Sequence, residues 1–239
     1  MKYLELNFSD AASNLACDEA LLDHCEAAND GEILRLWEPA NHFVVLGYSN
    51  RTAVEVDMAV CGTSGIAIFR RFTGGGAVLQ GPGCLNYTLV IKNSKAGYIG
   101  DVAASYGRVL QRHRALVREL TGEKVEIEGS SDLAIGGQKF SGNAQHRKQR
   151  YSVFHGTFLL NLNLSLIETC LPMPSREPRY RQRRSHRLFL RNLEINGDSL
   201  RDGLKETWGA NEKFDGVPHK RIDDLIEQRY SRKEWNHKF

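Results

Sequence analysis

The chain lacks the patterns that define several large protein classes. No apolar run among its 239 residues approaches the ~20 residues that a membrane-spanning helix needs, and the start at Met1–Glu5 has no long apolar core of a signal peptide. Its five cysteines are scattered and odd in number, and none forms a CxxC pair. Neither a zinc site nor a disulfide framework is therefore indicated. The expectation is a cytoplasmic protein without membrane attachment.

The chain also has little excess charge. The formal net charge is +3, which does not indicate a nucleic-acid partner, and no internal repeat or low-complexity tract is present. The hydrophobic fraction of 41% can form a substantial core, so the length predicts one domain over residues 1–239. Positive charge is concentrated in the segment Arg176–Arg191, where seven arginines are opposed by Glu177 alone. Such a segment is either solvated surface or a contact for an acidic partner or a phosphate chain.

Hydrophobic periodicity predicts an α+β fold. Helices are expected from Ser13-Asn14 to about Cys25, from Asp101 to Gly122, and over much of 199–239. His113 lies on the apolar stripe of the second helix and is expected to be a histidine of the core or its edge, not a ligand. Short strands are expected at 4–6, 33–37, 43–47, 66–69, 85–91, 125–127, 132–135 and 156–162, with 33–37 and 43–47 paired. Because the order has no regular βαβ rhythm, we expect a mixed, largely antiparallel sheet flanked by helices.

The most informative stretch is Arg70–Val78, which reads Arg-Arg-Phe-Thr-Gly-Gly-Gly-Ala-Val. Glycine permits positive φ and close approach of a ligand to the backbone, and arginine offers a fixed fork of donors to a phosphate or carboxylate. A glycine run can also be only a flexible turn. Because strand-like segments flank this one on both sides, we favour a loop that holds an anion or a polar acyl group.

A second stretch, Asp132–Gln145, places a lysine beside glycines. Lys139 follows Gly136-Gly137 and precedes a small, polar Ser-Gly-Asn-Ala segment that we expect to be a turn. A lone lysine is usually a solvated surface residue. Here its ammonium could neutralise a carboxylate or phosphate whose charge changes during a reaction.

Four stretches in this order resemble the lipoate–protein ligase A family of the biotin/lipoate ligase superfamily. They are Arg70–Val78, Gly83–Tyr87, Gly137–Gln145 and His155–Thr157. The similarity extends from the helix at Asn14–Leu22 to Tyr230–Trp235 and so covers nearly the whole chain. It implies the catalytic-domain fold of these ligases and a two-step reaction. Lipoate and ATP, with Mg²⁺, form lipoyl-AMP, and the lipoyl group then passes to a lysine of an acceptor protein.

The resemblance also implies roles for particular residues. Lys139 would be catalytic and contact the lipoate carboxylate and the α-phosphate, and Arg71 would bind the nucleotide phosphates. The adenylate and lipoyl pocket would be completed by Gly74, Gly75, Gly76, Ala77, Val78, Leu79, Asn86, Gly142, Asn143 and Ala144. No metal ligand is assigned. The implied partners are a lipoyl-acceptor domain, which we expect to have an acidic surface, and a separately encoded accessory domain in place of a C-terminal one.

One departure keeps a second reading open. Family ligases carry His-Asp soon after the glycines, whereas this chain has Gln80-Gly81-Pro82-Gly83, closer to the octanoyltransferase branch. A transferase of that kind would need no ATP and would hold the acyl group as a thioester on Cys84 or Cys170. Free cysteine is more often a small buried hydrophobe, and the sequence offers no obvious histidine partner, so we favour the ligase. A biotin–protein ligase fits the uninterrupted glycines less well, and a non-catalytic binding protein would not need Lys139.

Overall fold

Two β-sheets organise the chain in the computed structural model, which describes residues 1–29, 31–93 and 102–239. The larger sheet has the strand order β11-β1-β2-β6-β10-β9-β8-β7, and the smaller has the order β4-β3-β5. The larger is formed by β1 (Lys2–Glu5), β2 (Ile33–Trp37), β6 (Cys84–Lys92), β7 (Val125–Glu128), β8 (Asp132–Ile135), β9 (Gln138–Arg147), β10 (Tyr151–Leu159) and β11 (Glu212–Lys213). The smaller is formed by β3 (Phe43–Leu46), β4 (Ala67–Arg70) and β5 (Val78–Gln80). Most neighbours are antiparallel, while β1 is parallel to β2 and β11, and β3 to β4. The predicted mixed, largely antiparallel sheet is confirmed.

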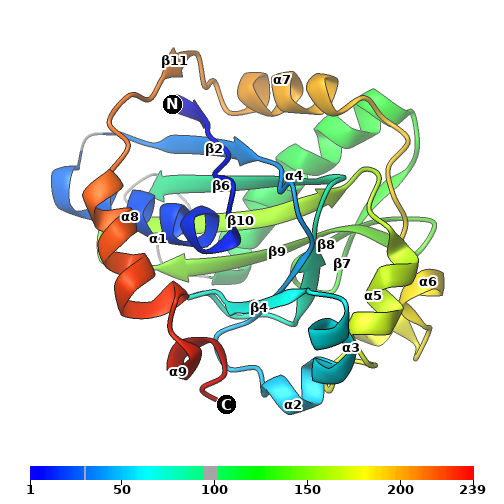
Figure 1. The fold of residues 1–239 in the computed structure, drawn as a ribbon. Coiled ribbons are helices and arrows are strands. Elements are labelled where there is room, and N and C mark those ends of the chain that lie inside the picture. The colour runs from blue at the N-terminus through cyan, green and yellow to red at the C-terminus, as the bar shows by residue number, and fades with distance from the viewer. Residues whose placement is uncertain (30, 94–101) are drawn as a thin grey trace.

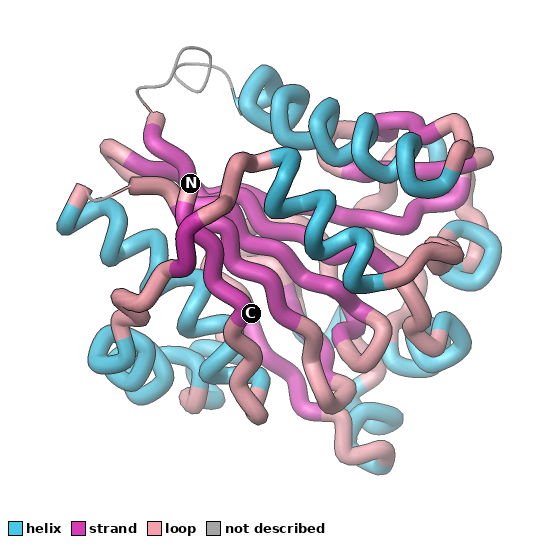
Figure 2. The backbone as a smooth tube through the Cα atoms, turned by 90° about the horizontal axis from the view of Figure 1, so that it is seen from above, coloured by secondary structure: helices cyan, strands magenta, loops and turns pink. Residues whose placement is uncertain are grey.

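Helices cover both faces of the larger sheet (Figures 1 and 2). On one face α1 (Ala11–Ala28) packs with α8 (His219–Leu225) and the π-helical turn Ile226–Tyr230. On the other face α4 (Val102–Thr121) packs with α7 (Gly197–Thr207). The strands between them are buried on both sides, so their residues alternate between two hydrophobic clusters rather than between core and water.

Shorter helices surround the smaller sheet at the lower end of Figure 1, where the C-terminus also lies. They are α2 (Thr52–Glu55), α3 (Met58–Thr63), α5 (Leu164–Cys170), the 3₁₀ turn Arg179–Arg181, α6 (His186–Phe189) and α9 (Lys233–Asn236). A third hydrophobic cluster joins β3 and β5 to α3 and α5. No helix of the described residues combines the length and the apolar character that crossing a membrane requires.

Two local predictions about strands are wrong. Strands β2 and β3 do not pair, because β2 lies between β1 and β6 and both of its edges are occupied. The segment Ser141–Ala144 is not a turn but the middle of β9, which pairs with β8 and β10. Small residues are needed there for close packing: a Cβ on neighbouring Gly156 would lie 2.0 Å from Asn143 Oδ1.

Helix positions agree with the sequence except at their ends. Helix α1 begins at Ala11, because Asp10 caps it by accepting the Ser13 backbone N–H, so the predicted start at Ser13-Asn14 is wrong. The expected start of α4 at Asp101 lies outside the described residues. His113 is fully buried in the core, as predicted. The strand expected at 156–162 lies earlier in the chain, as β10 (Tyr151–Leu159). The region 199–239, expected to be largely helical, contains the short strand β11.

Candidate active site

Two rows of side chains cross the α1-facing side of the larger sheet. Hydrogen-bonded register places Arg35, Thr88, His155 and Ala144 side by side on β2, β6, β10 and β9. The next row, two residues along each strand, runs Trp37, Asn86, Thr157, Gly142 and Asp132 from β2 to β8. Cross-strand neighbours in register lie on the same face. Residues far apart in the sequence therefore form one continuous polar wall.

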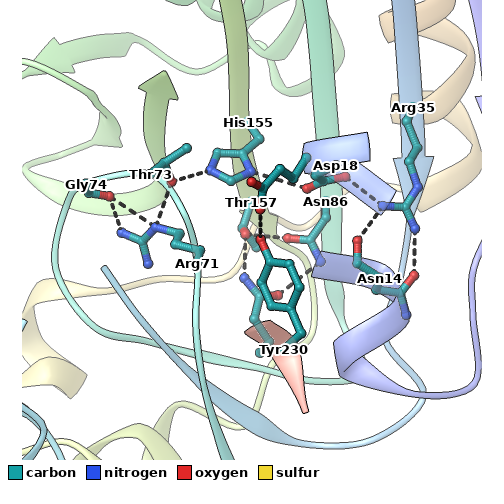
Figure 3. A network of polar contacts seen from close by, with 12 residues as sticks. Asn14, Asp18, Arg35, Arg71, Thr73, Gly74, Asn86, His155, Thr157 and Tyr230 are labelled. Carbon is teal, nitrogen blue, oxygen red and sulfur yellow. Dashed lines mark hydrogen bonds and ion pairs between the residues drawn. The ribbon is translucent and has the colours of Figure 1, made fainter. Parts of the chain in front are cut away.

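Two residues of the first row, His155 and Arg35, belong to a chain of hydrogen bonds from the glycine loop to α1 (Figure 3). Arg71 Nε donates to Thr73 Oγ1 at 3.1 Å, and Thr73 Oγ1 lies 2.7 Å from His155 Nε2. His155 Nδ1 lies 3.2 Å from Asp18 Oδ2, and Asp18 Oδ1 accepts from Arg35 at 2.6 Å. Since arginine is only a donor, we infer that the Thr73 hydroxyl donates to Nε2 and that Nδ1–H donates to Asp18. The relay thus holds the His155 ring in one orientation, with a partner on each nitrogen.

The acidic end of this relay is buried. Burial alone would raise the pKa of Asp18, but the Arg35 guanidinium and His155 outweigh it and lower that pKa below its usual value. Arg35 is itself fully buried and donates further to Asn14 Oδ1, Asn14 O and Leu6 O. Every group of the pair has a partner, so Asp18 remains an anion that holds the relay in place.

Arg71 holds the glycine loop by its backbone. Its Nη2 donates to Gly74 O at 2.6 Å and to Gly76 O at 2.9 Å. Gly75 has φ +98°, where glycine is favoured, and a Cβ there would lie 2.6 Å from Arg71 Nη2. The loop also packs on Gly47, whose Cβ position would lie 2.0 Å from Gly75 O. The loop is therefore tied to Arg71 and Gly47 by close backbone contacts.

Arg71 is a buried cation without a buried anion beside it. Only 8% of the residue is exposed, and no carboxylate of the described residues lies within ion-pair distance. Burial lowers the pKa of Arg71 to about 10. An isolated buried charge is unfavourable by several kcal/mol, so an anion bound at this loop would be stabilised by Arg71.

The second row closes into a ring of side chains. Gln80 Nε2 donates to Thr157 Oγ1 at 2.8 Å, Thr157 Oγ1 donates to Asn86 Oδ1 at 2.5 Å, and Asn86 Nδ2 donates to Gln80 Oε1 at 3.0 Å. The ring ties the end of the glycine loop to β6 and β10. Gln80 thus has a defined structural role.

Lys139 lies at the other end of the row. Its Nζ is 2.9 Å from Asp132 Oδ1, and it lies over Gly142, whose Cβ position would be 2.7 Å from the same Nζ. The Tyr180 hydroxyl donates to Asp132 Oδ2 at 2.8 Å. Burial and the Asp132 charge raise the pKa of Tyr180, which therefore stays protonated and a donor. One carboxylate is thus shared by a lysine of the sheet and a tyrosine of the arginine-rich segment.

Two adjoining cavities meet at this lysine. One of about 170 Å³ runs beneath the glycine loop along the polar wall, past Leu15, Trp37 and Val45. The other, of about 420 Å³, lies between β8, β9 and the arginine-rich segment. Both are lined by Gly76, Ala77, Val78, Gln80, Asp132, Lys139, Gly142 and Thr157. Lys139 therefore lies where a group bound in the narrow cavity would meet a group bound in the wide one.

The structure brings most of the predicted site residues to these cavities. Arg71, Gly75, Gly76, Ala77, Val78, Asn86, Lys139, Gly142, Asn143 and Ala144 line the first cavity, and Leu79 lines the second. Gly74 is exposed beside them. Both polar atoms of the Asn143 side chain bond to the protein: Oδ1 accepts from Tyr87 Oη at 2.7 Å and Nδ2 donates to Ser131 O at 2.6 Å. Its side chain thus ties β9 to β6 and to the turn before β8.

Sequence reasoning missed Asp18 and Arg35 and gave no role to His155. Asp18 and Arg35 carried no local signal, because they come from a helix and a strand whose apolar residues dominate the pattern. His155 and Thr157 belong to one of the four stretches that carry the family resemblance. Only the β6–β10 pairing shows that they face the site.

All five cysteines are buried, and none lines either cavity. Cys84 begins β6 inside the third hydrophobic cluster, and burial raises its pKa to about 12. Cys170 ends α5 in the same cluster with no exposed surface. Since a thiolate is the reactive form, Cys84 is not activated in this conformation.

The arginine-rich segment divides into two groups. Arg181, Arg184 and Arg191 are held by the protein: Arg181 bonds to Arg184 O, Arg184 to Gly137 O and Tyr180 O, and Arg191 to Glu123. The other four, Arg176, Arg179, Arg183 and Arg187, are exposed, and within the described chain their guanidinium groups make no hydrogen bond or ion pair. The charge available to a partner therefore belongs to these four.

Comparison with known proteins places these features in a family. Residues 10–200 match the family of the lipoyl protein ligase A/B catalytic domain. The octanoyltransferase LipM of Moorella thermoacetica is 31% identical over 201 residues, 75% of this chain and 72% of that protein. Subunit 1 of lipoate-protein ligase A from Thermoplasma acidophilum is 26% identical over 239 residues, 93% of this chain and 90% of that protein.

Solved structures show the same fold. A bi-partite lipoate protein ligase from Thermoplasma acidophilum, described with its E2 lipoyl domain, superposes with a TM-score of 0.83 at 23% identity, covering 99% of this chain and 95% of that one. A lipoate-protein ligase A bound with ATP gives a TM-score of 0.82 at 24% identity, covering 99% and 98%.

Proposed function

The chain belongs to the lipoyl protein ligase A/B catalytic domain family, and from this premise we propose that it is an ATP-dependent lipoate–protein ligase. In this proposal it joins lipoate to AMP and passes the lipoyl group to a lysine of an acceptor protein. The observation that carries the proposal is Lys139, whose ammonium lies where the two cavities meet, together with the position of every cysteine outside those cavities.

Adenylation brings two anions together, a carboxylate and a phosphate. Fixed cations and backbone N–H groups that are already oriented reduce this repulsion. Lys139 would contact the carboxylate and the α-phosphate, and the loop Gly74–Gly76 would offer its backbone. Arg71 would attract the phosphates, because no carboxylate neutralises its charge and its burial strengthens the electrostatic interaction. The apolar tail would enter the narrow cavity between Leu15, Trp37 and Val45.

The side chains of the site offer few ligands for Mg²⁺. Mg²⁺ usually binds through one or two carboxylates, phosphate oxygens of the substrate and several waters. The described residues hold no cluster of three or more His, Cys, Asp or Glu side chains suited to a metal. Asp132 lines both cavities and Asp18 the narrow one, where it is already bonded to Arg35 and His155. The site fits a metal carried in with the nucleotide rather than one held by the protein alone.

A second function remains a specific alternative, because 31% and 30% identical relatives carry the name octanoyltransferase. It would require an acyl thioester on Cys84 or Cys170. Both thiols lie in the third hydrophobic cluster and would have to become exposed first.

Mass spectrometry of a lipoyl domain separates the two functions. The domain is incubated with the protein and lipoate, with and without ATP, and also with an octanoyl-loaded carrier protein. The ligase predicts a lipoyl adduct only with ATP, and Cys84→Ala and Cys170→Ala retain it. An adduct that forms from the carrier without ATP and disappears in either cysteine variant would establish the transferase instead.

The acceptor is proposed to dock beside the wide cavity. Exposed Arg176 lines that cavity, and exposed Arg179, Arg183 and Arg187 lie in the same segment, so an acidic acceptor surface fits this edge. Charge reversal at Arg179 and Arg183 should raise the acceptor KM, most strongly at low salt, while Lys213→Glu at strand β11 should not. An acceptor KM that is the same in both variants would place docking elsewhere. By analogy with the bi-partite relative, a separately encoded accessory domain is a further proposed partner.

A further inference from the structure

We propose that Asp132 is the base that removes a proton from the acceptor lysine, and that Tyr180 is the residue that positions it. This inference rests on the proposed ligase function and concerns its second step, the attack on lipoyl-AMP.

The second step needs a base. A lysine side chain with a pKa near 10.4 is neutral in only about one molecule in 2,500 at pH 7. The ammonium form has no lone pair and cannot attack the mixed anhydride. A base within hydrogen-bond reach of the incoming nitrogen typically accelerates such a step by about 10²–10⁴-fold.

Asp132 has the position that this base requires. Its carboxylate lines both cavities and is 7% exposed, so it lies at the junction where the anhydride would lie. Tyr180 Oη at 2.8 Å and Lys139 Nζ at 2.9 Å hold its two oxygens apart and in place. The other carboxylate of the narrow cavity, Asp18, is already bonded to Arg35 and His155.

The two histidines that line these cavities cannot serve as the base. His155 Nε2 is bonded to Thr73 and Nδ1 to Asp18, so neither nitrogen is free to accept a proton. His186, which lines the wide cavity, has its Nε2 within 3.2 Å of Pro172 O, and burial lowers its pKa. Glu177 also lines the wide cavity, but it accepts from the Arg183 backbone N–H and pairs with Arg181. Among the described carboxylates that line these cavities, Asp132 is the one bonded to Lys139.

Lys139 gives Asp132 a way to act at the right time. In the structure its ammonium neutralises Asp132. An adenylate between the cavities offers Lys139 a phosphate and a carbonyl oxygen instead, and Lys139 can turn toward them because its side chain is flexible and 24% exposed. Asp132 then loses its cation and retains the neutral Tyr180 donor. A carboxylate without a neighbouring cation accepts a proton more readily.

The proton and electron balance is complete. The acceptor ε-ammonium transfers one proton to an Asp132 oxygen, and the nitrogen lone pair forms the C–N bond at the acyl carbon. The C–O bond to phosphate then breaks, and its electron pair leaves with AMP. The nitrogen loses its second proton to water, and Asp132 returns its own proton to water when the product leaves.

The test separates lysine from a nucleophile that needs no base. Full-length wild type, Asp132→Asn and Tyr180→Phe are each loaded with lipoyl-AMP from lipoate and ATP in a single turnover, and the yield of lipoyl-AMP is measured. Transfer is then followed to a lipoyl domain and, separately, to hydroxylamine, which is neutral at pH 7. Asp198→Asn, which neutralises a carboxylate with 90% exposure on α7, is the matched control.

For Asp132→Asn we expect normal lipoyl-AMP formation and nearly normal reaction with hydroxylamine. Transfer to the lipoyl domain should fall by about 10²–10³-fold. Tyr180→Phe should show a smaller loss in the same step, and Asp198→Asn none. A loss of lipoyl-AMP formation in Asp132→Asn as large as the loss of transfer would overturn the inference, since Asp132 would then align Lys139 or bind a metal.

Equal losses with hydroxylamine and lysine would overturn it as well. If Asp132→Asn is poorly folded, as judged by its thermal unfolding midpoint, the same comparison in Tyr180→Phe decides the question. If wild type itself forms no lipoyl-AMP, the proposed ligase function fails, and that outcome is distinct from either result above.

Discussion

Adding one methyl group at Gly142 tests whether the position of the Lys139 ammonium controls activity. A Cβ at Gly142 would lie 2.7 Å from Lys139 Nζ and 2.8 Å from Lys139 Cε. Ordinary contacts between such atoms are about 3.5–4.0 Å, so the ammonium has to move by about 1 Å. The atoms in the way belong to the end of a flexible side chain, so the strand itself need not shift.

Gly142→Ala should therefore separate activity from stability. A displacement of about 1 Å at a reacting group can lower the rate about 10²-fold, which corresponds to about 2.7 kcal/mol. The fold loses only the 2.9 Å contact of Lys139 with Asp132 and gains the lower chain entropy of alanine, so unfolding should change by less than about 1 kcal/mol. For a chain of this size that is a shift in Tm of less than about 4 °C.

The assay is kcat/KM for lipoylation of a lipoyl domain, with Tm measured on the same samples. Gly62→Ala in α3 is the matched control, because a Cβ there has no other atom within 4 Å. The reasoning is refuted if Gly142→Ala keeps wild-type kcat/KM. It is also refuted if the loss of activity is accompanied by a large fall in Tm.

Two further predictions concern buried charges. Arg71→Lys keeps the charge but cannot bridge the carbonyls of Gly74 and Gly76, so the free energy of unfolding should fall by about 3 kcal/mol in urea titrations. Unchanged stability with weaker ATP binding would instead show that the Arg71 fork serves the ligand. Burial lowers the pKa of His113 to about 3, whereas an unfolded histidine binds a proton near pH 6.5. Its contribution to stability is thus complete above pH 6.5 and lost as pH falls toward 3. At pH 4.5 the loss should be about 2.7 kcal/mol relative to pH 7, and His113→Gln, measured in parallel, should lack this component.

Local patterns predicted those parts of the site that depend on neighbours in sequence. The glycine run requires conformations that few residues other than glycine adopt, and Gly75 has such a conformation at φ +98°. Arg71 and Lys139 are charged residues beside glycines, and both line the narrow cavity. The local pattern gave a wrong prediction at Ser141–Ala144, where small polar residues suggested a turn. Close packing of Gly142 against Lys139 explains the same small residues within a strand.

Contacts between distant segments followed only from the tertiary structure. Asp18 and His155 are separated by 137 positions and meet because α1 packs on the face of the sheet where β10 exposes its odd-numbered residues. Asp132 and Tyr180, 48 positions apart, meet because the arginine-rich segment folds over β8 and β9. A sequence pattern reports the period of a helix or a strand but not which faces will be opposed.

By itself, then, the sequence determined the α+β class, the glycine loop and the lysine, because each depends on local backbone chemistry or on the periodicity of apolar residues. Only the tertiary structure decided that β2 joins β6 rather than β3, and that the cysteines lie outside both cavities. It also decided that Lys139 shares Asp132 with Tyr180. Strand order and side-chain burial come from the packing of whole elements against one another, and no local window of residues contains that information.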